Sequence, residues 1–195
     1  MKFSQTLRSL RHYLLAALFF LLISVLITFP LILHLKDSII GGYGDGLYFA
    51  WLIRWYQGFI FDGSAAPFFN PQMNFPEGWN LSTTDTAVAT TLPGVPFSLL
   101  WGPIAGYNIA MWVTFVLSGL AMYIWVYRLT RSKLSALLAG TIYAFLPYRI
   151  AHFQAGHLNL SGTAWFPLYF MGLYEVLHSR TRWHWAGSLL TAAAL

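Results

Sequence analysis

The sequence predicts an all-α integral membrane protein, and three observations lead to this prediction. Of the 195 residues, 57% are hydrophobic and 9% are charged, whereas soluble domains carry about a quarter charged residues. Long apolar runs recur along the chain, and the basic residues stand in short clusters between them. The same features exclude a disordered chain and a basic face for nucleic acid, and the absence of cysteine excludes disulfides and thiolate chemistry.

The apolar runs predict about four complete transmembrane helices and the start of a fifth. A helix that crosses a bilayer needs about 20 mostly apolar residues. The predicted spans are residues 13–35, 107–127, 134–150 and 160–177, and residues 186–195 begin the fifth. Because the chain stops inside this last run, we expect residues 1–195 to be a single membrane domain, the N-terminal part of a longer multi-pass protein.

The basic clusters predict the orientation, since cytoplasmic loops are enriched in Lys and Arg. With the N-terminus in the cytoplasm and an uncleaved first span, most basic residues lie inside: Lys2, Arg8, Arg11, Arg128, Arg131, Lys133, Arg180 and Arg182. Residues 36–106 then form a long external loop. This pattern suits a bacterial inner membrane.

The external loop is expected to be partly helical. Trp51, Trp55 and Phe59 recur at helical spacing within residues 47–61. This predicts a helix that lies in the headgroup layer or packs on the outer ends of the spans. Residues 88–104 are also apolar but rich in Pro and Gly, which favours a re-entrant or surface-lying segment over a span.

Two acids of this loop are candidate site residues. Asp45 lies between glycines at the start of the predicted helix, where it caps the helix or meets a polar headgroup at the membrane surface. Asp85 follows a run of hydroxyl residues, where it caps the next helical piece or contacts a substrate.

A second polar segment lies between the third and fourth predicted spans, on the same outer side. Arg149 either extends to the headgroups or holds a phosphate oxygen. His152 and His157 are either candidate metal ligands or structural hydrogen-bonding groups. Five residues apart, they are about 140° apart around a helix, so they share a face only if Gly156 breaks the helix.

Several motifs together resemble the GT-C glycosyltransferase superfamily of multi-pass membrane proteins. They are, in chain order, a Gly-Asp before the Trp-rich segment, Phe-Pro-Glu-Gly, Gly-Pro-Ile-Ala-Gly-Tyr-Asn, Arg-Leu-Thr-Arg, and Pro-Tyr-Arg followed by Gly-His-Leu-Asn-Leu and Trp-Phe-Pro-Leu. The resemblance covers nearly the whole chain, as the N-terminal part of such a protein.

The resemblance implies transfer of a sugar from a polyprenyl-phosphate donor to an acceptor on the outer face of the membrane. Asp45 matches the acidic residue of the first external loop, which acts as general base or metal ligand. Arg149, His152 and His157, together with Asp85, become candidates for binding the substrate, and membrane lipids are expected partners. A divalent cation stays open as a cofactor, but the chain has no adjacent acid pair or Asp-x-Asp motif.

Two other functions remain open. A transporter usually carries ionisable residues or broken helices near the bilayer midplane, whereas the first two predicted spans carry no charge. A scaffolding membrane protein is the third alternative.

Overall fold

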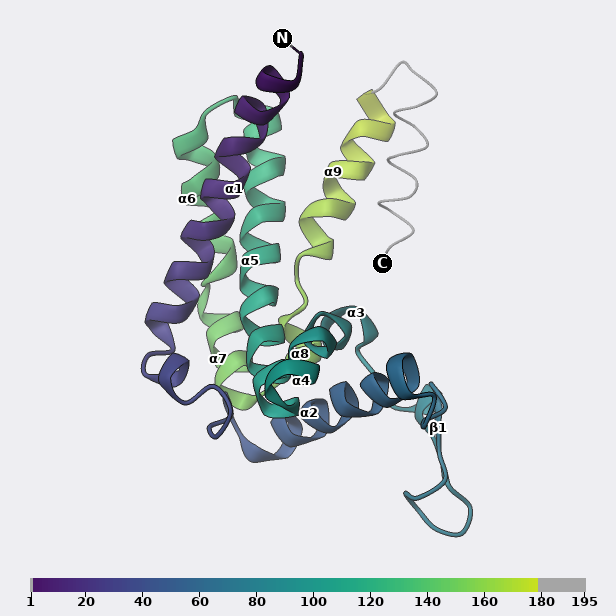
Figure 1. Cartoon of the computed structure of the whole chain (residues 1–195). Coiled ribbons are helices and arrows are strands. Elements are labelled where there is room, and N and C mark those ends of the chain that lie inside the picture. The colour runs from purple at the N-terminus through teal and green to yellow at the C-terminus, as the bar shows by residue number, and fades with distance from the viewer. Residues whose placement is uncertain (1, 179–195) are drawn as a thin grey trace. The chain divides into compact units, whose positions relative to one another are not determined.

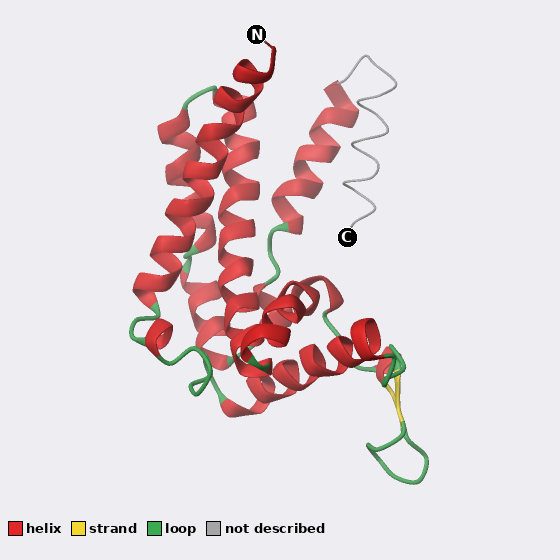
Figure 2. Ribbon diagram, viewed as in Figure 1, coloured by secondary structure: helices red, strands yellow, loops and turns green. Residues whose placement is uncertain are grey.

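The protein is mostly helical in its computed structural model, which describes residues 2–178 (Figures 1 and 2). This confirms the all-α prediction. The helices are α1 Lys2–Ile27, α2 Tyr43–Gln57, α3 Val88–Thr91, α4 Val95–Trp101, α5 Pro103–Thr130, α6 Lys133–Ala144, α7 Pro147–Ala155, α8 Leu158–Ser161 and α9 Trp165–His178. The 3₁₀ turns are Leu31–Leu33, Leu81–Thr83 and Leu92–Gly94, and a π-helical turn at Gly58–Asp62 extends α2.

One small strand pair interrupts this helical pattern. Strands β1 (Phe69–Asn70) and β2 (Trp79–Asn80) are antiparallel, with Phe69 opposite Asn80, and these two strands, yellow in Figure 2, close a hairpin whose loop is green.

The chain divides into two compact units. Of the described residues, the first contains residues 2–26, 114–146 and 163–178, and the second contains residues 27–113 and 147–162. The long external loop of the sequence prediction therefore belongs to one unit together with the beginning of α5, α7 and α8.

Two helices are long and apolar enough to cross a membrane: residues Leu10–Ile27 of α1 and Pro103–Thr130, which is α5. Helices α6 and α7 pass the same test only when taken together, as a bent pair. Four complete spans are therefore not supported by the described residues. The predicted fifth span, residues 186–195, and the cluster of Arg180 and Arg182 lie outside them.

Proline explains two of the three differences between the predicted spans and the helices. The first helix ends at Ile27 and not at residue 35, because Pro30 cannot donate to the helical ladder. The third breaks after Ala144, because Pro147 begins a new helix and disfavours helical geometry in the residue before it. The fourth begins at Trp165 and not at residue 160, after the separate turn of α8. The second prediction, residues 107–127, lies wholly within α5.

Within the first unit, α1, α5 and α6 run side by side (Figure 1). Phe20 is fully buried, and its ring lies against the Cα positions of Gly119 and Gly140. A Cβ at either glycine would approach this ring to within 2.8 Å, so only glycine allows the helices to pack this closely. The opposite face of α1 is apolar and exposed, with Leu14 and Leu26 about 70% accessible, as a lipid-facing surface requires.

Within the second unit, α2 buries one face and presents a row of aromatic rings on its flank. Phe49, Leu52 and Ile53 are buried in the unit. Trp51 stacks on Tyr48 and on Trp55, with ring centroids 6.0 Å and 5.7 Å apart. The helix predicted over residues 47–61 is therefore confirmed. Its placement in the headgroup layer stays a prediction.

The segment rich in Pro and Gly folds as α3, a 3₁₀ turn and α4, and is too short to span a bilayer. Gly94 and Gly106 meet backbone to backbone, since a Cβ at Gly94 would lie 2.5 Å from the Gly106 carbonyl oxygen. The glycines of this segment thus allow a close approach that larger residues would prevent.

Candidate functional site

The candidate site is built around the turn that joins α7 to α8, in the second unit. Gly156 ends α7 with φ of +84°, its N–H donates to the Phe153 carbonyl, and the N–H of His157 donates to the His152 carbonyl. These two bonds form a Schellman motif, which brings the residues at its two ends together. The spacing of His152 and His157 predicted that the two side chains share a face only if Gly156 breaks the helix, and Gly156 does break it.

A second glycine segment packs directly on this turn. Gly41 has φ of +77°, and a Cβ there would lie 2.5 Å from the backbone nitrogen of Gly156. A Cβ at Gly156 would in turn lie 3.1 Å from the Gly42 oxygen and the Gly46 nitrogen. The start of α2 is thereby held against the α7–α8 turn, because neither side carries a side chain.

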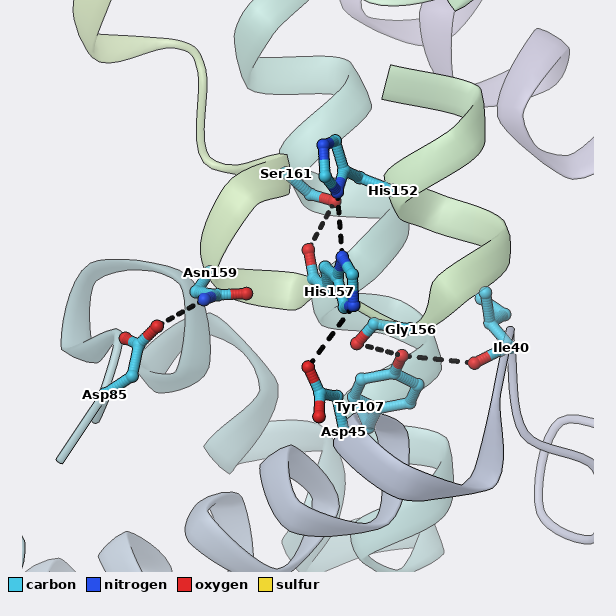
Figure 3. A network of polar contacts seen from close by, with 9 residues as sticks. All are labelled: Ile40, Asp45, Asp85, Tyr107, His152, Gly156, His157, Asn159 and Ser161. Atoms are coloured by element: carbon cyan, nitrogen blue, oxygen red, sulfur yellow. Dashed lines mark hydrogen bonds and ion pairs between the residues drawn. The ribbon is translucent and has the colours of Figure 1, made fainter. Parts of the chain in front are cut away.

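Two residues at the beginning of α5 fix this arrangement. The hydroxyl of Tyr107 lies 3.1 Å from the carbonyl oxygens of both Ile40 and Gly156, and donates its proton between them (Figure 3). The Asn108 side chain donates to the carbonyls of Leu35 and Ser38 and accepts from the N–H of Ile40. Both side chains are fully buried, so these bonds are shielded from water.

Sequence reasoning missed Tyr107 and Asn108 as site residues. The available signal was a phenol and an amide near the start of a mostly apolar helix. Such polar groups need partners when buried, and an irregular segment such as residues 35–42 has free backbone groups to offer.

The assembled turn brings three of the predicted residues into one chain of contacts (Figure 3). Nε2 of His157 faces Oδ2 of Asp45 at 3.4 Å, and Nδ1 of His157 forms a hydrogen bond of 2.8 Å with Nδ1 of His152. The Asp45 side chain is 55% exposed and that of His157 is 33% exposed. The accessible carboxylate of Asp45 thus contacts the imidazole of His157, which in turn contacts the imidazole of His152.

The capping role predicted for Asp45 is wrong. Gly42 is the N-cap of α2, and Asp45 lies inside the first turn, where its charge favours the helix dipole without forming a capping bond. The two glycines before Tyr43 let the helix begin earlier than the sequence pattern indicated, which turns Asp45 toward His157.

Asp85 lies beside the same turn but contacts a different residue. The amide of Asn159 donates to the Asp85 carboxylate, and the hydroxyl of Tyr48 is 3.2 Å from both the Asp85 carbonyl and the Thr84 hydroxyl. Asp85 does not cap α3, whose N-cap is Ala87. Asp45 and Asp85 are therefore anchored to positions 157 and 159 of one short segment.

Arg149 does not extend to the surface. Its side chain is 1% exposed, the largest of the fully buried side chains described, so the role of reaching the headgroups is wrong. A buried guanidinium is always charged and so requires polar surroundings in place.

Tyr56, on α2, is 3% exposed, and this burial raises the pKa of its hydroxyl, which therefore stays protonated.

The described residues contain no group of three or more His, Asp or Glu side chains that could hold a metal ion. The reason is visible at His157, whose two ring nitrogens face Asp45 and His152 from opposite edges of the ring, so the three side chains do not converge. The arrangement is suited to proton transfer at Asp45.

An open cavity of about 460 Å³ lies in the same unit. Its walls come from the end of α1, the glycine segment and α7: Ile27, Thr28, Leu31, residues 39–42, Ile150, Phe153 and Gln154. Half of the lining residues are aliphatic, and Gly41 and Gly42 belong both to this wall and to the packing against Gly156.

Comparisons of the chain with models of protein families, with curated proteins and with solved structures give no match.

Proposed function

We propose that the protein transfers a sugar from a polyprenyl-phosphate donor to an acceptor on the outer face of a membrane. One observation carries the proposal. The carboxylate of Asp45 is accessible and yet held in place by His157, and this is the arrangement that a general base requires. The sequence resemblance selects the same residue.

The chemistry follows from the two carboxylate oxygens. Oδ2 of Asp45 faces His157, which leaves Oδ1 to accept the proton of an acceptor hydroxyl. The hydroxyl oxygen then bonds to the anomeric carbon while the bond from that carbon to the phosphate oxygen breaks. The phosphate leaves with the bonding electrons, and the proton stays on Asp45.

The apolar cavity supports a lipid-linked donor. Its aliphatic wall at the end of α1 is suited to hydrocarbon, and Gly42 of its wall stands three residues before Asp45 in the sequence. In this proposal Asp85 contributes to binding the polar part of the substrate, His157 and His152 act through Asp45, and surrounding membrane lipids are partners. The proposed topology places the N-terminus in the cytoplasm and suits a bacterial inner membrane.

The test uses the protein in liposomes with a radiolabelled polyprenyl-phosphate sugar and a soluble acceptor. Asp45→Asn is expected to lower transfer at least about 100-fold, because the amide cannot accept the proton. Asp37→Asn is the matched control. Asp37 is also an exposed acid of the same unit, 3.8 Å from a histidine, His34. Equal activity of the two variants would contradict the assignment of Asp45.

A transporter is the second candidate, and one observation favours it. Helices α6 and α7 form a bent pair that is apolar enough to span a membrane only as a broken helix, and Arg149 is buried on α7. Broken helices with buried charges are typical of transport sites. Uptake of a labelled solute into liposomes, abolished by Arg149→Gln and unaffected by Asp45→Asn, would favour transport over transfer.

A further inference from the structure

The hydrogen bond between His152 and His157 constrains where both rings carry their protons. Their Nδ1 atoms are 2.8 Å apart, at the two ends of the Schellman turn (Figure 3). A hydrogen bond between two imidazole nitrogens holds a single proton, so one nitrogen donates and the other accepts.

The contact of Nε2, the other ring nitrogen of His157, limits which nitrogens of the two rings carry protons. Nε2 faces Oδ2 of Asp45, and an ionised carboxylate only accepts, so Nε2 of His157 carries a proton. Two states satisfy both contacts. A neutral His157 accepts at Nδ1 from Nδ1–H of His152. A charged His157 donates from Nδ1 to a His152 whose proton is on Nε2.

We propose that His152 is a positioning residue, which keeps the Nε2–H of His157 directed at Asp45 in both charge states of His157. An imidazole can do this because it donates in one tautomer and accepts in the other. Without His152, only the Asp45 carboxylate favours a proton on Nε2 of a neutral His157, and the ring is free to turn away from Asp45 and hold its proton on Nδ1. The effect on turnover rests on the proposed function, whereas the proton positions concern these three side chains alone.

Neighbouring groups hold the His152 ring in place, but they do not replace its hydrogen bond to His157. The ring of Tyr148 packs edge-on against it, with centroids 4.4 Å apart. The backbone turn is closed by the main-chain bond from His157 to His152 and by the Ser161 hydroxyl, which donates to the His157 carbonyl. A change of the His152 side chain therefore leaves the fold of the turn in place.

The first test reads the protons directly, by ¹⁵N NMR of the histidine-labelled protein in detergent micelles. The chain has six histidines, and each signal is assigned by its loss in a single-residue variant. We expect His157 to carry a proton on Nε2 in the wild type and in His152→Asn, whose amide can donate or accept at Nδ1. In His152→Leu we expect a mixture of the two tautomers of His157.

The second test measures sugar transfer by the same variants. His152→Leu is expected to lower kcat about tenfold or more with KM unchanged, and His152→Asn is expected to restore most of it. A wild-type tautomer and wild-type turnover in His152→Leu would overturn the proposal, and so would an Asn variant as impaired as the Leu variant. If the wild type transfers no sugar, the proposed function fails, while the NMR result still decides the role of His152.

Discussion

Two pairs of aspartate and histidine lie in the second unit, and they are built in opposite ways. His34 and Asp37 are three residues apart and face each other at 3.8 Å, with side chains 55% and 74% exposed. His157 and Asp45 come from segments far apart in the sequence, face each other at 3.4 Å and are less exposed. The residue types are the same, and only the second pair continues to a further side chain, His152.

The difference lies in what holds each pair together. The local pair needs no tertiary structure, because a short turn already places the two side chains side by side. The distant pair requires the loop between its members to close, which costs conformational entropy. The contact of Gly41 with Gly156 and the hydroxyl of Tyr107 offset this cost. A structure that maintains a costly pair of exposed groups points to a use for that pair.

The largest effect is expected from Gly156→Ala, which should break the distant pair and spare the local one. The left-handed backbone costs an alanine about 1–2 kcal/mol, and its Cβ would also press on the Gly42 oxygen and the Gly46 nitrogen at 3.1 Å. We expect a total loss of about 3 kcal/mol in the free energy of unfolding, measured by chemical denaturation in detergent, and a changed NMR signal of His157.

Gly63→Ala is the matched control, because Gly63 also has a positive φ, +61°, but open space around its Cβ position. It should lose about 1 kcal/mol and leave the His157 signal as in the wild type. If the two variants behave alike, the close packing of residues 41 and 156 contributes nothing to the site.

A smaller effect is expected from Tyr107→Phe. The change removes only the hydroxyl, which is shared between two buried carbonyl oxygens, so the unfolding free energy should fall by about 1–2 kcal/mol. Tyr43→Phe, at a position 77% exposed, should leave the stability unchanged. Thermal unfolding of the two variants, followed by circular dichroism, measures the contrast. Equal melting temperatures would mean that the hydroxyl of Tyr107 does not tie the two segments.

The smallest effect is expected at the local pair. His34→Gln should change the unfolding free energy by less than about 0.5 kcal/mol, because exposed ion pairs contribute little. Transfer activity should also stay at the wild-type level. A clear loss of transfer in this variant would remove the contrast between the two pairs and with it the reason to single out Asp45.

The sequence predicted the helices whose hydrophobic or aromatic pattern lies within one continuous stretch of the chain. The periodicity of Trp51 and Trp55 predicted α2, and an unbroken apolar run predicted α5. The ends of the other helices were less predictable, because Pro30 interrupts a run that remains apolar beyond it and Pro147 begins a new helix inside the predicted third span. Hydropathy counts side chains, whereas proline acts through the backbone bond it cannot make.

For the site, the residue types were accessible from the sequence but the connections between them were not. Asp45, His152 and His157 stand out as polar groups in an apolar chain. Their contact depends on the left-handed backbone of Gly156 and on a hydroxyl and an amide supplied by α5. These are tertiary contacts, and the spacing of residues in the sequence does not predict them.

The packing of Gly41 against Gly156 also sets an order of events during biosynthesis. Gly41 cannot reach its partner until the ribosome has added the residues up to 156, which takes about 6–23 s at about 5–20 residues per second. Throughout this interval Gly41, Gly42 and Asp45 lack their contacts with residues 156 and 157. The site is therefore among the later parts of this region to mature, and a slow stretch of translation between the two glycines would prolong the period in which the nascent chain has an exposed, unassembled loop.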